Sequence, residues 1–341
     1  EVPQAVQDAF NAHIRIFIIT GDNEITARAI AKNIGLSNPD NSLPEVITQK
    51  RLATMNDSDI KKALLQRTLV FSRVSPDDKL KIVTLLKEMG EVVAVTGDGV
   101  NDTLSLKKAD IGVAMGQNGS KVAQEAAAMV LLNDNFSTIV KAIKEGRTIF
   151  NNIRKNVIAT LASNTAELVC VLYGFIGVYF NQPIAILAIH ILLIDLIGEM
   201  LPLLMLTFDQ ADESIMKAHP RKKGQLLNRS LLIQVLSSGA IRGLLAVIVF
   251  NYVFYFHKGE ADQHATAVTG TFITIILTQF INIFCIRTKN SVFGSFLFSN
   301  PNLIWGMALS LLAMFTIIYT PFFNLYLHTG PLTIRDWIFP V

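Results

Sequence analysis

Long apolar segments fill the second half of the 341-residue chain and restrict its folds more than any other feature. They lie near 156–180, 184–208, 233–257, 267–287 and 302–325, and each reaches the roughly 20 residues that a helix needs to cross a bilayer. Only 17% of the residues are charged, which is low for a soluble protein. The sequence therefore predicts an integral, multi-pass membrane protein with an all-α transmembrane helix bundle, in contact with the lipid bilayer.

Basic residues in the connecting loops predict the orientation of these segments. The loops after the second and fourth segments are rich in them, namely Lys217, Arg221, Lys222, Lys223, Arg229, Arg287 and Lys289. Cytoplasmic loops carry an excess of such residues. We therefore expect residues 1–155, 209–232 and 287–301 on the cytoplasmic side. Residues 328–341 are then an extracytoplasmic loop, which we expect to be cut before a last helix.

Polar and acidic residues interrupt three of the apolar segments. They form pairs three or four positions apart, on one face of each helix: Asn164 with Glu167, Asp195 with Glu199, and Gln279 with Asn282. A charge at membrane depth is costly unless it is paired or hydrated. Oxygen ligands on three helices suit a hard cation that has left water. We interpret these residues as candidate ligands of a transported cation, and the alternative is polar packing between helices.

Other residues of the apolar segments have structural interpretations. Gly198 and Pro202 are expected to interrupt their helix and to free backbone carbonyls. Gly239 and Gly243 have the spacing of close helix packing. Arg242 is expected to extend its charged group to the cytoplasmic surface of the membrane.

Residues 1–144 have the pattern of an α/β domain. In IRIFIITGDN (14–23) and EVVAVTGDGVND (91–102), an apolar run is followed by TGD, and each stretch precedes a helical pattern. The run RTLVFSRV leads into SPDDK, where Pro76 opens a helix, and IGVAM and MVLLN predict two further strands. Repeated strand–loop–helix units predict a parallel sheet, whose ligands gather at the carboxyl ends of the strands.

The side chains at these strand ends have the chemistry of a phosphoryl-transfer site. Aspartates can bind Mg²⁺ there, while Lys and Thr neutralise and hydrogen-bond phosphate oxygens. One TGD alone is typical of an ordinary turn, whereas two, with a lysine-bearing helix and DGVND, are far more specific. The net charge of +3 gives no case for nucleic-acid binding. Cys170 and Cys285 lie in apolar runs, which argues against a disulfide framework or a zinc site.

In chain order, TGDN, SPDDK, TGDGVNDTLSLKKADIGVAMG, EGRTIFNNIRK, SNTAE and IDLIGEMLP resemble the type II P-type ATPases, which include calcium and sodium/potassium pumps. The resemblance covers essentially the whole chain. It implies a partial haloacid-dehalogenase-like (Rossmann-type) phosphorylation domain at 1–144, a stalk at 145–155 and a transmembrane domain at 156–327. It also implies ATP-driven cation transport through an aspartyl-phosphate, Mg²⁺ and ATP as cofactors, and a plasma-membrane location.

The resemblance assigns roles to individual residues. Asp98 matches the Mg²⁺-binding aspartate, with Asp102 as an additional candidate. The phosphate site matches Thr20, Gly21, Asp22, Lys79, Asn101 and Asp102, and the transported-ion site matches Asn164, Glu167, Asp195, Glu199, Gln279 and Asn282. The DKTGT motif that carries the phosphorylated aspartate does not occur in the sequence. We therefore expect a C-terminal portion, inactive by itself, whose partner is the missing N-terminal part of the same pump.

The identity of the cation and two other functions stay open. Asp195, Gln279 and the stretch IRTKNSVF resemble sodium/potassium pumps more than calcium pumps, which slightly favours a monovalent cation. Three carboxylates without a lysine also suit a divalent cation. A membrane-tethered phosphatase of the same fold has no use for mid-membrane carboxylates. A non-catalytic membrane scaffold would be distinguished by the absence of DKTGT from the complete gene.

Overall fold

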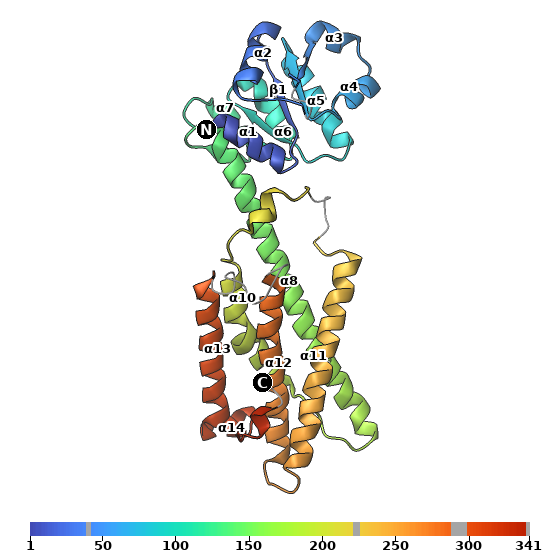
Figure 1. Cartoon of the computed structure of the whole chain (residues 1–341), viewed down its shortest axis with the longest axis vertical. Coiled ribbons are helices and arrows are strands. Elements are labelled where there is room, and N and C mark those ends of the chain that lie inside the picture. Colours follow the sequence, from blue (N-terminus) through green and yellow to red (C-terminus); the bar gives the residue numbers. More distant parts are fainter. Residues whose placement is uncertain (39–41, 221–225, 288–298, 339–341) are drawn as a thin grey trace. The chain divides into compact units, whose positions relative to one another are not determined.

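The computed structural model describes residues 1–38, 42–220, 226–287 and 299–338. The chain forms two compact units: unit 1 is Glu1–Arg147 with Asp212–Gly224, and unit 2 is Thr148–Ala211 with Gln225–Val341. Helix α8 (Phe136–Tyr179) contributes residues to both units (Figure 1). The basic residues at 221–223 and 289, and most of the IRTKNSVF stretch, lie outside the described residues.

Unit 1 contains two three-stranded parallel sheets. The first has the order β1–β3–β2, with β1 at Ile16–Ile19, β2 at Glu45–Thr48 and β3 at Thr68–Ser72. The second has the order β4–β5–β6, with β4 at Ala94–Gly97, β5 at Ile111–Met115 and β6 at Met129–Leu131. The two strands that lead into TGD, β1 and β4, are thus edge strands of their sheets.

Helices follow the strands of unit 1, as the sequence predicts (Figure 1). Four begin at a polar N-cap whose side chain accepts a backbone N–H of the first turn, the contact that starts a helix most favourably: Asn23, Asn56, Ser75 and Ser120. The helices are α1 (Val2–Asn11), α2 (Glu24–Asn33), α3 (Gln49–Thr54), α4 (Asp57–Ala63), α5 (Pro76–Glu88), α6 (Thr103–Lys108) and α7 (Lys121–Ala126).

One hydrophobic cluster connects the two TGD-bearing strands. Phe17 and Ile19 of β1 and Val95 of β4 pack against buried residues of β3 and α5, among them Phe71 and Ile82. Burial of such side chains supplies about 25 cal/mol for each Å² of apolar surface removed from water. This shared core holds the ends of β1 and β4 in one region of unit 1.

Unit 2 is a bundle of apolar helices. Beyond α8 it contains α9 (Ala188–Leu193), a π-helical segment (Ile194–Glu199), α10 (Met200–Leu206), α11 (Arg229–Phe256), α12 (Gln263–Arg287), α13 (Pro301–Tyr319) and α14 (Pro321–Leu327). Within the described residues, five helical segments are long and apolar enough to cross a membrane, which confirms the predicted number. The π-helical segment confirms that the second span is irregular around Gly198.

One predicted boundary was wrong. The fifth span ends at Tyr319 rather than near 325, because Pro321 has no backbone N–H and Thr320 before it is extended at φ −99° and ψ 117°. Helix α8 begins at Phe136, so it contains the predicted stalk at 145–155 and continues into the first span.

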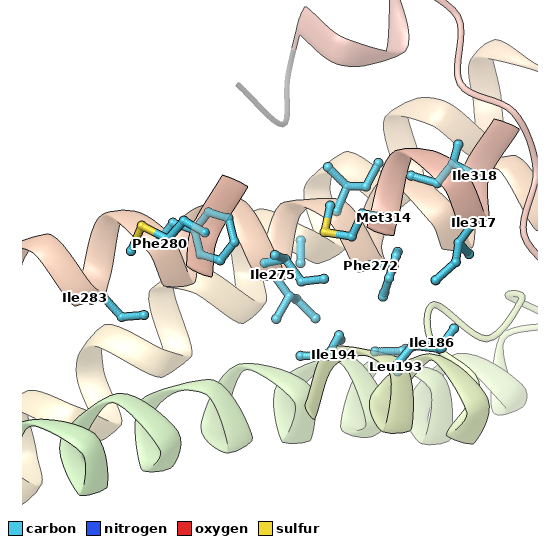
Figure 2. Packing of buried hydrophobic residues seen from close by; sticks show 14 of the residues in the cluster. Ile186, Leu193, Ile194, Phe272, Ile275, Phe280, Ile283, Met314, Ile317 and Ile318 are labelled. Atoms are coloured by element: carbon cyan, nitrogen blue, oxygen red, sulfur yellow. The ribbon is translucent and has the colours of Figure 1, made fainter. Parts of the chain in front are cut away.

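Side chains from several helices meet in the centre of unit 2. Figure 2 shows Leu193 and Ile194 directed toward Phe272 and Ile275 of α12, with Ile317 of α13 nearby. Helix α11 packs closely against α8 at two glycines of α11. A Cβ on Gly239 would lie 2.5 Å from the carbonyl oxygen of Ala162, and one on Gly243 would lie 2.7 Å from that of Ala166. This confirms the close helix packing that the glycine spacing predicts.

Candidate functional site

The loop after β1 is closed by its own side chains. Thr20 Oγ1 donates to Asp22 Oδ2 at 3.0 Å and accepts from the Asp22 backbone N–H at 3.1 Å. The loop is also tied to the end of β3, since the backbone N–H of Arg73 donates to the Asp22 carbonyl at 2.9 Å. Gly21 lies between them in open space. Thr20 and Asp22 therefore stand at the carboxyl end of β1, where the sequence places a phosphate-binding loop.

The loop after β4 is organised around Asp102. This buried carboxylate accepts from Lys79 Nζ at 2.7 Å, so it brings the first turn of α5 to the end of β4. A Cβ on Gly97 would lie 2.5 Å from the Asp102 Cβ, so only glycine fits at that position. Ser75 begins α5 with a capping box formed with Asp78, which fixes the helix start beside Lys79. The structure thus joins two of the predicted phosphate-site residues in an ion pair.

Asp98 and Asn101 have a different environment. Both are exposed, and neither side chain makes a hydrogen bond within the described part of the chain. The Asp98 backbone is held, because its carbonyl accepts from the Ser120 N–H at 2.8 Å. Across the described ranges, no hydrogen bond joins this loop to Thr20 or Asp22. The carboxylate of Asp98 is thus free to take a ligand.

The donor set can be compared with the requirements of Mg²⁺. The described residues contain no group of three or more His, Cys, Asp or Glu that could hold a metal by itself. Mg²⁺ keeps several waters and commonly binds one or two carboxylates together with substrate phosphate. Asp98 fits this pattern, whereas one oxygen of Asp102 is already engaged by Lys79. The residues suit a magnesium ion that arrives with a phosphoryl group.

Buried acids gather in the bundle of unit 2. Glu167 of α8 is 6% exposed and Glu199 of the π-helical segment is 2% exposed. Glu199 accepts from Ser163 Oγ on α8, which joins the two elements. Asp195 is exposed on the same segment, and the three carboxylates interact electrostatically with one another. The structure thus brings the predicted acids of two spans together.

The three amide residues of the predicted ion site differ in their exposure and in their hydrogen-bond partners. Gln279 of α12 is fully buried and donates from Nε2 to the Ala159 carbonyl of α8 at 3.1 Å. Asn282 donates to Gln279 Oε1 at 3.2 Å. Asn164 is exposed. Gln279 therefore connects α12 to α8, and Asn282 supports it.

The expectation that Arg242 extends to the membrane surface was wrong. Its side chain is 6% exposed and donates to Thr278 Oγ1 at 3.3 Å and to the Ile275 carbonyl at 3.4 Å, both on α12. The position of Arg242 halfway along α11 could have indicated a buried side chain, because ionisable groups at membrane depth almost always face the interior of the bundle.

The sequence analysis also missed a buried ionic cluster. Asp209, just after α10, accepts from Lys155 Nζ at 2.7 Å and from Arg287 Nη2 at 2.8 Å. Asn300 Nδ2 adds a contact to the same carboxylate at 3.4 Å, and Asn152 donates to the Asp209 carbonyl at 2.8 Å. The cluster connects α8, α12 and the residues before α13. Its members are far apart in sequence, so only the fold reveals it.

The two halves of the chain match different protein-family models. Residues 183–341 match the family model described as cation transporting ATPase, C-terminus. Residues 1–110 and 79–143 match two models described as haloacid dehalogenase-like hydrolase. The apolar bundle and the α/β unit are thus recognised separately.

Individual relatives match nearly the whole chain. A calcium-transporting ATPase of Bacillus subtilis is 39% identical over 99% of this chain and 37% of its own length. The sodium/potassium-transporting ATPase subunit alpha of Hydra vulgaris is 32% identical over 99% of this chain and 38% of its own length. The chain therefore spans less than two fifths of these relatives. Together with the family models, they show that the chain belongs to the P-type cation-transporting ATPases and matches their C-terminal portion.

Proposed function

We propose that the chain is part of an ATP-driven cation pump that works through an aspartyl-phosphate. One observation carries the proposal: Glu167 and Glu199 are buried together inside an apolar bundle, in a chain that also contains a phosphate-type loop pair. A membrane-tethered phosphatase or a scaffold would have no reason to maintain such costly groups at membrane depth. A pump needs both features, one to receive the phosphoryl group and one to hold the cation.

At the strand ends, each residue has a distinct role. Asp98 would hold Mg²⁺, which supplies positive charge to the phosphate oxygens when it is bound. Lys79 would neutralise a phosphate oxygen, and its ion pair with Asp102 keeps the ammonium in place at 2.7 Å. Thr20 would donate its hydroxyl to a second oxygen. Positioning and charge neutralisation of this kind provide most of the catalysis in phosphoryl transfer.

The aspartate that accepts the phosphoryl group would come from a part of the pump outside residues 1–341, together with the ATP-binding region. The edges of β1 and β4 support this, since each strand pairs on one side only. Ala94 and Thr96 of β4 are exposed although the strand follows an apolar run. An additional parallel strand between β1 and β4 would cover these edges and bring a carboxylate between the two loops.

Residues 1–155 and the loop near 212–218 would share the cytoplasmic side of the plasma membrane. Contacts inside unit 1 support the shared side. Met216 packs with Ala5, Ala9 and Val140, and Arg147 Nη1 donates to the Ile215 carbonyl at 3.0 Å. The choice of the plasma membrane rests on the resemblance alone.

The preference for a monovalent cation is not confirmed, because the relatives include both calcium-transporting and sodium/potassium-transporting ATPases. We retain it as a proposal that rests on Asp195 and Gln279. The test is an ATPase assay of the full-length protein in sodium, in potassium, in calcium and at acidic pH. Activation by calcium alone would overturn the monovalent proposal.

The same assay tests the transport site. Glu199→Gln and Asp195→Asn should raise the cation concentration for half-maximal ATPase activation at least about tenfold, which corresponds to about 1.4 kcal/mol. Phosphorylation by inorganic phosphate should persist, because the phosphate loops are unchanged. An unaltered cation dependence in both variants would overturn the assignment of the membrane acids.

A further inference from the structure

Arg242 lies too deep in its helix to reach the membrane surface. It stands halfway along the 28-residue α11, about 20 Å from either end at 1.5 Å per residue. Only 6% of the residue is exposed. A guanidinium in this position carries a large desolvation cost unless negative charge compensates it.

The hydrogen bonds of Arg242 do not provide that compensation. Both of its acceptors, Thr278 Oγ1 at 3.3 Å and the Ile275 carbonyl at 3.4 Å, are neutral and at long distance. Nη1 has no hydrogen-bond partner among the residues that the structure describes. The compensating charge must therefore come from groups that lie beyond hydrogen-bond distance.

The first such group is Glu167 of α8. Gly243, the neighbour of Arg242, is in contact with Ala166, the neighbour of Glu167: a Cβ on Gly243 would lie 2.7 Å from the Ala166 carbonyl oxygen. The two helices therefore touch at the level of both charged residues. Glu167 is buried as well, and its Oε1 has no hydrogen-bond partner within the described ranges.

The second group is Glu199. Ile275, which accepts from Arg242, precedes Ile276 on α12, and a Cβ on Gly198 would lie 2.6 Å from Ile276 Cδ1. Figure 2 shows Ile275 facing the segment that carries Ile194. Arg242 and the residue before Glu199 thus contact the same turn of α12. The Arg242 guanidinium interacts electrostatically with Glu199 and Glu167, the same two acids that these contacts indicate.

We propose that Arg242 is a fixed internal cation of the transport site, which sets the number of positive charges that the site binds. This proposal rests on the proposed transport function of Glu167, Asp195 and Glu199. Arginine keeps its proton in proteins, so its charge is present in every step of a cycle. It cancels one of the three negative charges and leaves room for two positive charges, as one divalent or two monovalent cations.

The test replaces the charge while keeping a hydrogen-bond donor. Arg242→Gln in the full-length protein, reconstituted in lipid, can still donate to the Ile275 carbonyl but has no charge. At saturation and alkaline pH, we expect it to bind one more positive charge per phosphorylation site than the unaltered protein. Binding is counted with radioactive calcium, sodium and rubidium together with proton uptake. An unchanged charge count would overturn the proposal.

Arg242→Lys is the matched control, because it preserves the charge and alters the hydrogen-bond geometry. We expect it to keep the charge count of the unaltered protein. A purely structural role of Arg242 predicts that the lysine and glutamine variants deviate in the same way, and that result would also overturn the proposal. The experiment with Glu199→Gln is separate: unaltered cation dependence there removes the transport site itself, whereas failure here removes only the role of Arg242.

If Arg242→Gln does not fold, a double variant still decides. Arg242→Gln combined with Glu167→Gln removes one charge of each sign. We expect the double variant to recover folded protein, measured as the monodisperse yield in detergent relative to the single variant. The absence of recovery would show that the two charges are not coupled and would overturn the proposal.

Discussion

Asp209 and Glu167 are both buried acids of unit 2, but their surroundings are opposite. The carboxylate of Asp209 is fully buried and accepts from Lys155 at 2.7 Å and from Arg287 at 2.8 Å. The Oε1 atom of Glu167 has no hydrogen-bond partner among the described residues. Asp209 is thus compensated by the protein's own cations, whereas Glu167 depends on weaker, more distant charge. An acid whose oxygens are already bound by basic side chains stabilises the bundle, whereas an acid with an unbound oxygen can bind a cation.

Unit 1 contains a similar contrast at smaller scale. Asp102 is buried and paired with Lys79 at 2.7 Å, while Asp98, four residues earlier, is exposed. The paired acid shapes the loop, and the exposed acid is available to a metal. In both units, the expected effect of removing an acid therefore depends on its partners.

The largest effect is expected for Asp209→Asn. This change removes the anion that the buried Lys155 and Arg287 share, which should lower the free energy of unfolding by about 3–5 kcal/mol. Thermal unfolding of the protein in detergent measures it. Asp262→Asn, an exposed acid of the same unit, is the control and should change stability by no more than about 0.5 kcal/mol. Equal melting temperatures for the two variants would show that the ion pairs of Asp209 do not stabilise unit 2.

Asp98→Asn should abolish most phosphoenzyme formation without loss of stability. An amide is a poor Mg²⁺ ligand, and loss of one charge-stabilising group in such sites costs about 10²–10³ in rate. The measurement is Mg²⁺-dependent phosphorylation of the full-length protein by inorganic phosphate. Asp57→Asn, an exposed acid of the same unit, should have no effect. Normal phosphoenzyme levels in Asp98→Asn would contradict its assignment to Mg²⁺.

Glu167→Gln should separate binding from stability within the bundle. Neutralising Glu167 removes a carboxylate with an unpaired oxygen and leaves Glu199 as an anion for Arg242, so the melting temperature should fall far less than in Asp209→Asn. The cation concentration for half-maximal ATPase activation should increase at least about tenfold. Destabilisation as large as that of Asp209→Asn would show that Glu167 is a structural acid too.

The smallest effect is expected from the protonation of His257, which lies directly after the end of α11 in unit 2. Burial lowers the pKa of His257, but its hydrogen bonds to Glu260 at 2.6 Å and to Asp336 at 2.9 Å outweigh burial and raise the pKa above the ordinary 6.5. The stabilisation is therefore complete below pH 6.5 and is lost as pH rises through the raised pKa. Melting temperature measured from acidic to alkaline pH should fall accordingly.

His257→Gln should remove this pH dependence, because glutamine has no charge to lose. His264→Gln is the matched control, since the His264 ring contacts the Ile184 carbonyl rather than a carboxylate. A pH dependence that survives in His257→Gln would assign it to other groups.

Local signals predicted much of unit 1. The apolar run IGVAM coincides with β5 at Ile111–Met115, and α5 begins at Pro76 as expected from its fixed φ. The strand β2 was missed, because EVIT lies between Pro44 and a polar stretch and does not belong to a longer apolar run. Strands inside longer apolar runs were thus predictable, and this one was not.

The candidate sites were predictable only in part. Spacing along one helix paired Asn164 with Glu167 and Asp195 with Glu199. The structure buries Glu167 and Glu199, whose elements Ser163 joins, and leaves Asn164 and Asp195 exposed. The Asp209 cluster depends on partners 54 and 78 positions away, a separation at which no helical or strand period operates. Arg242 was misjudged because its depth in α11 depends on where the helix begins.

The π-helical segment at Ile194–Glu199 has a consequence for changes in chain length. A π turn accommodates one residue more than an α turn. Deleting Leu196 would let the segment close into a regular α-helix while α9 and α10 keep their packing faces. The same deletion in α12 would rotate the rest of that helix by about 100°. The second span can therefore be shortened by one residue, which changes the spacing of Asp195 and Glu199 without repacking the bundle around them.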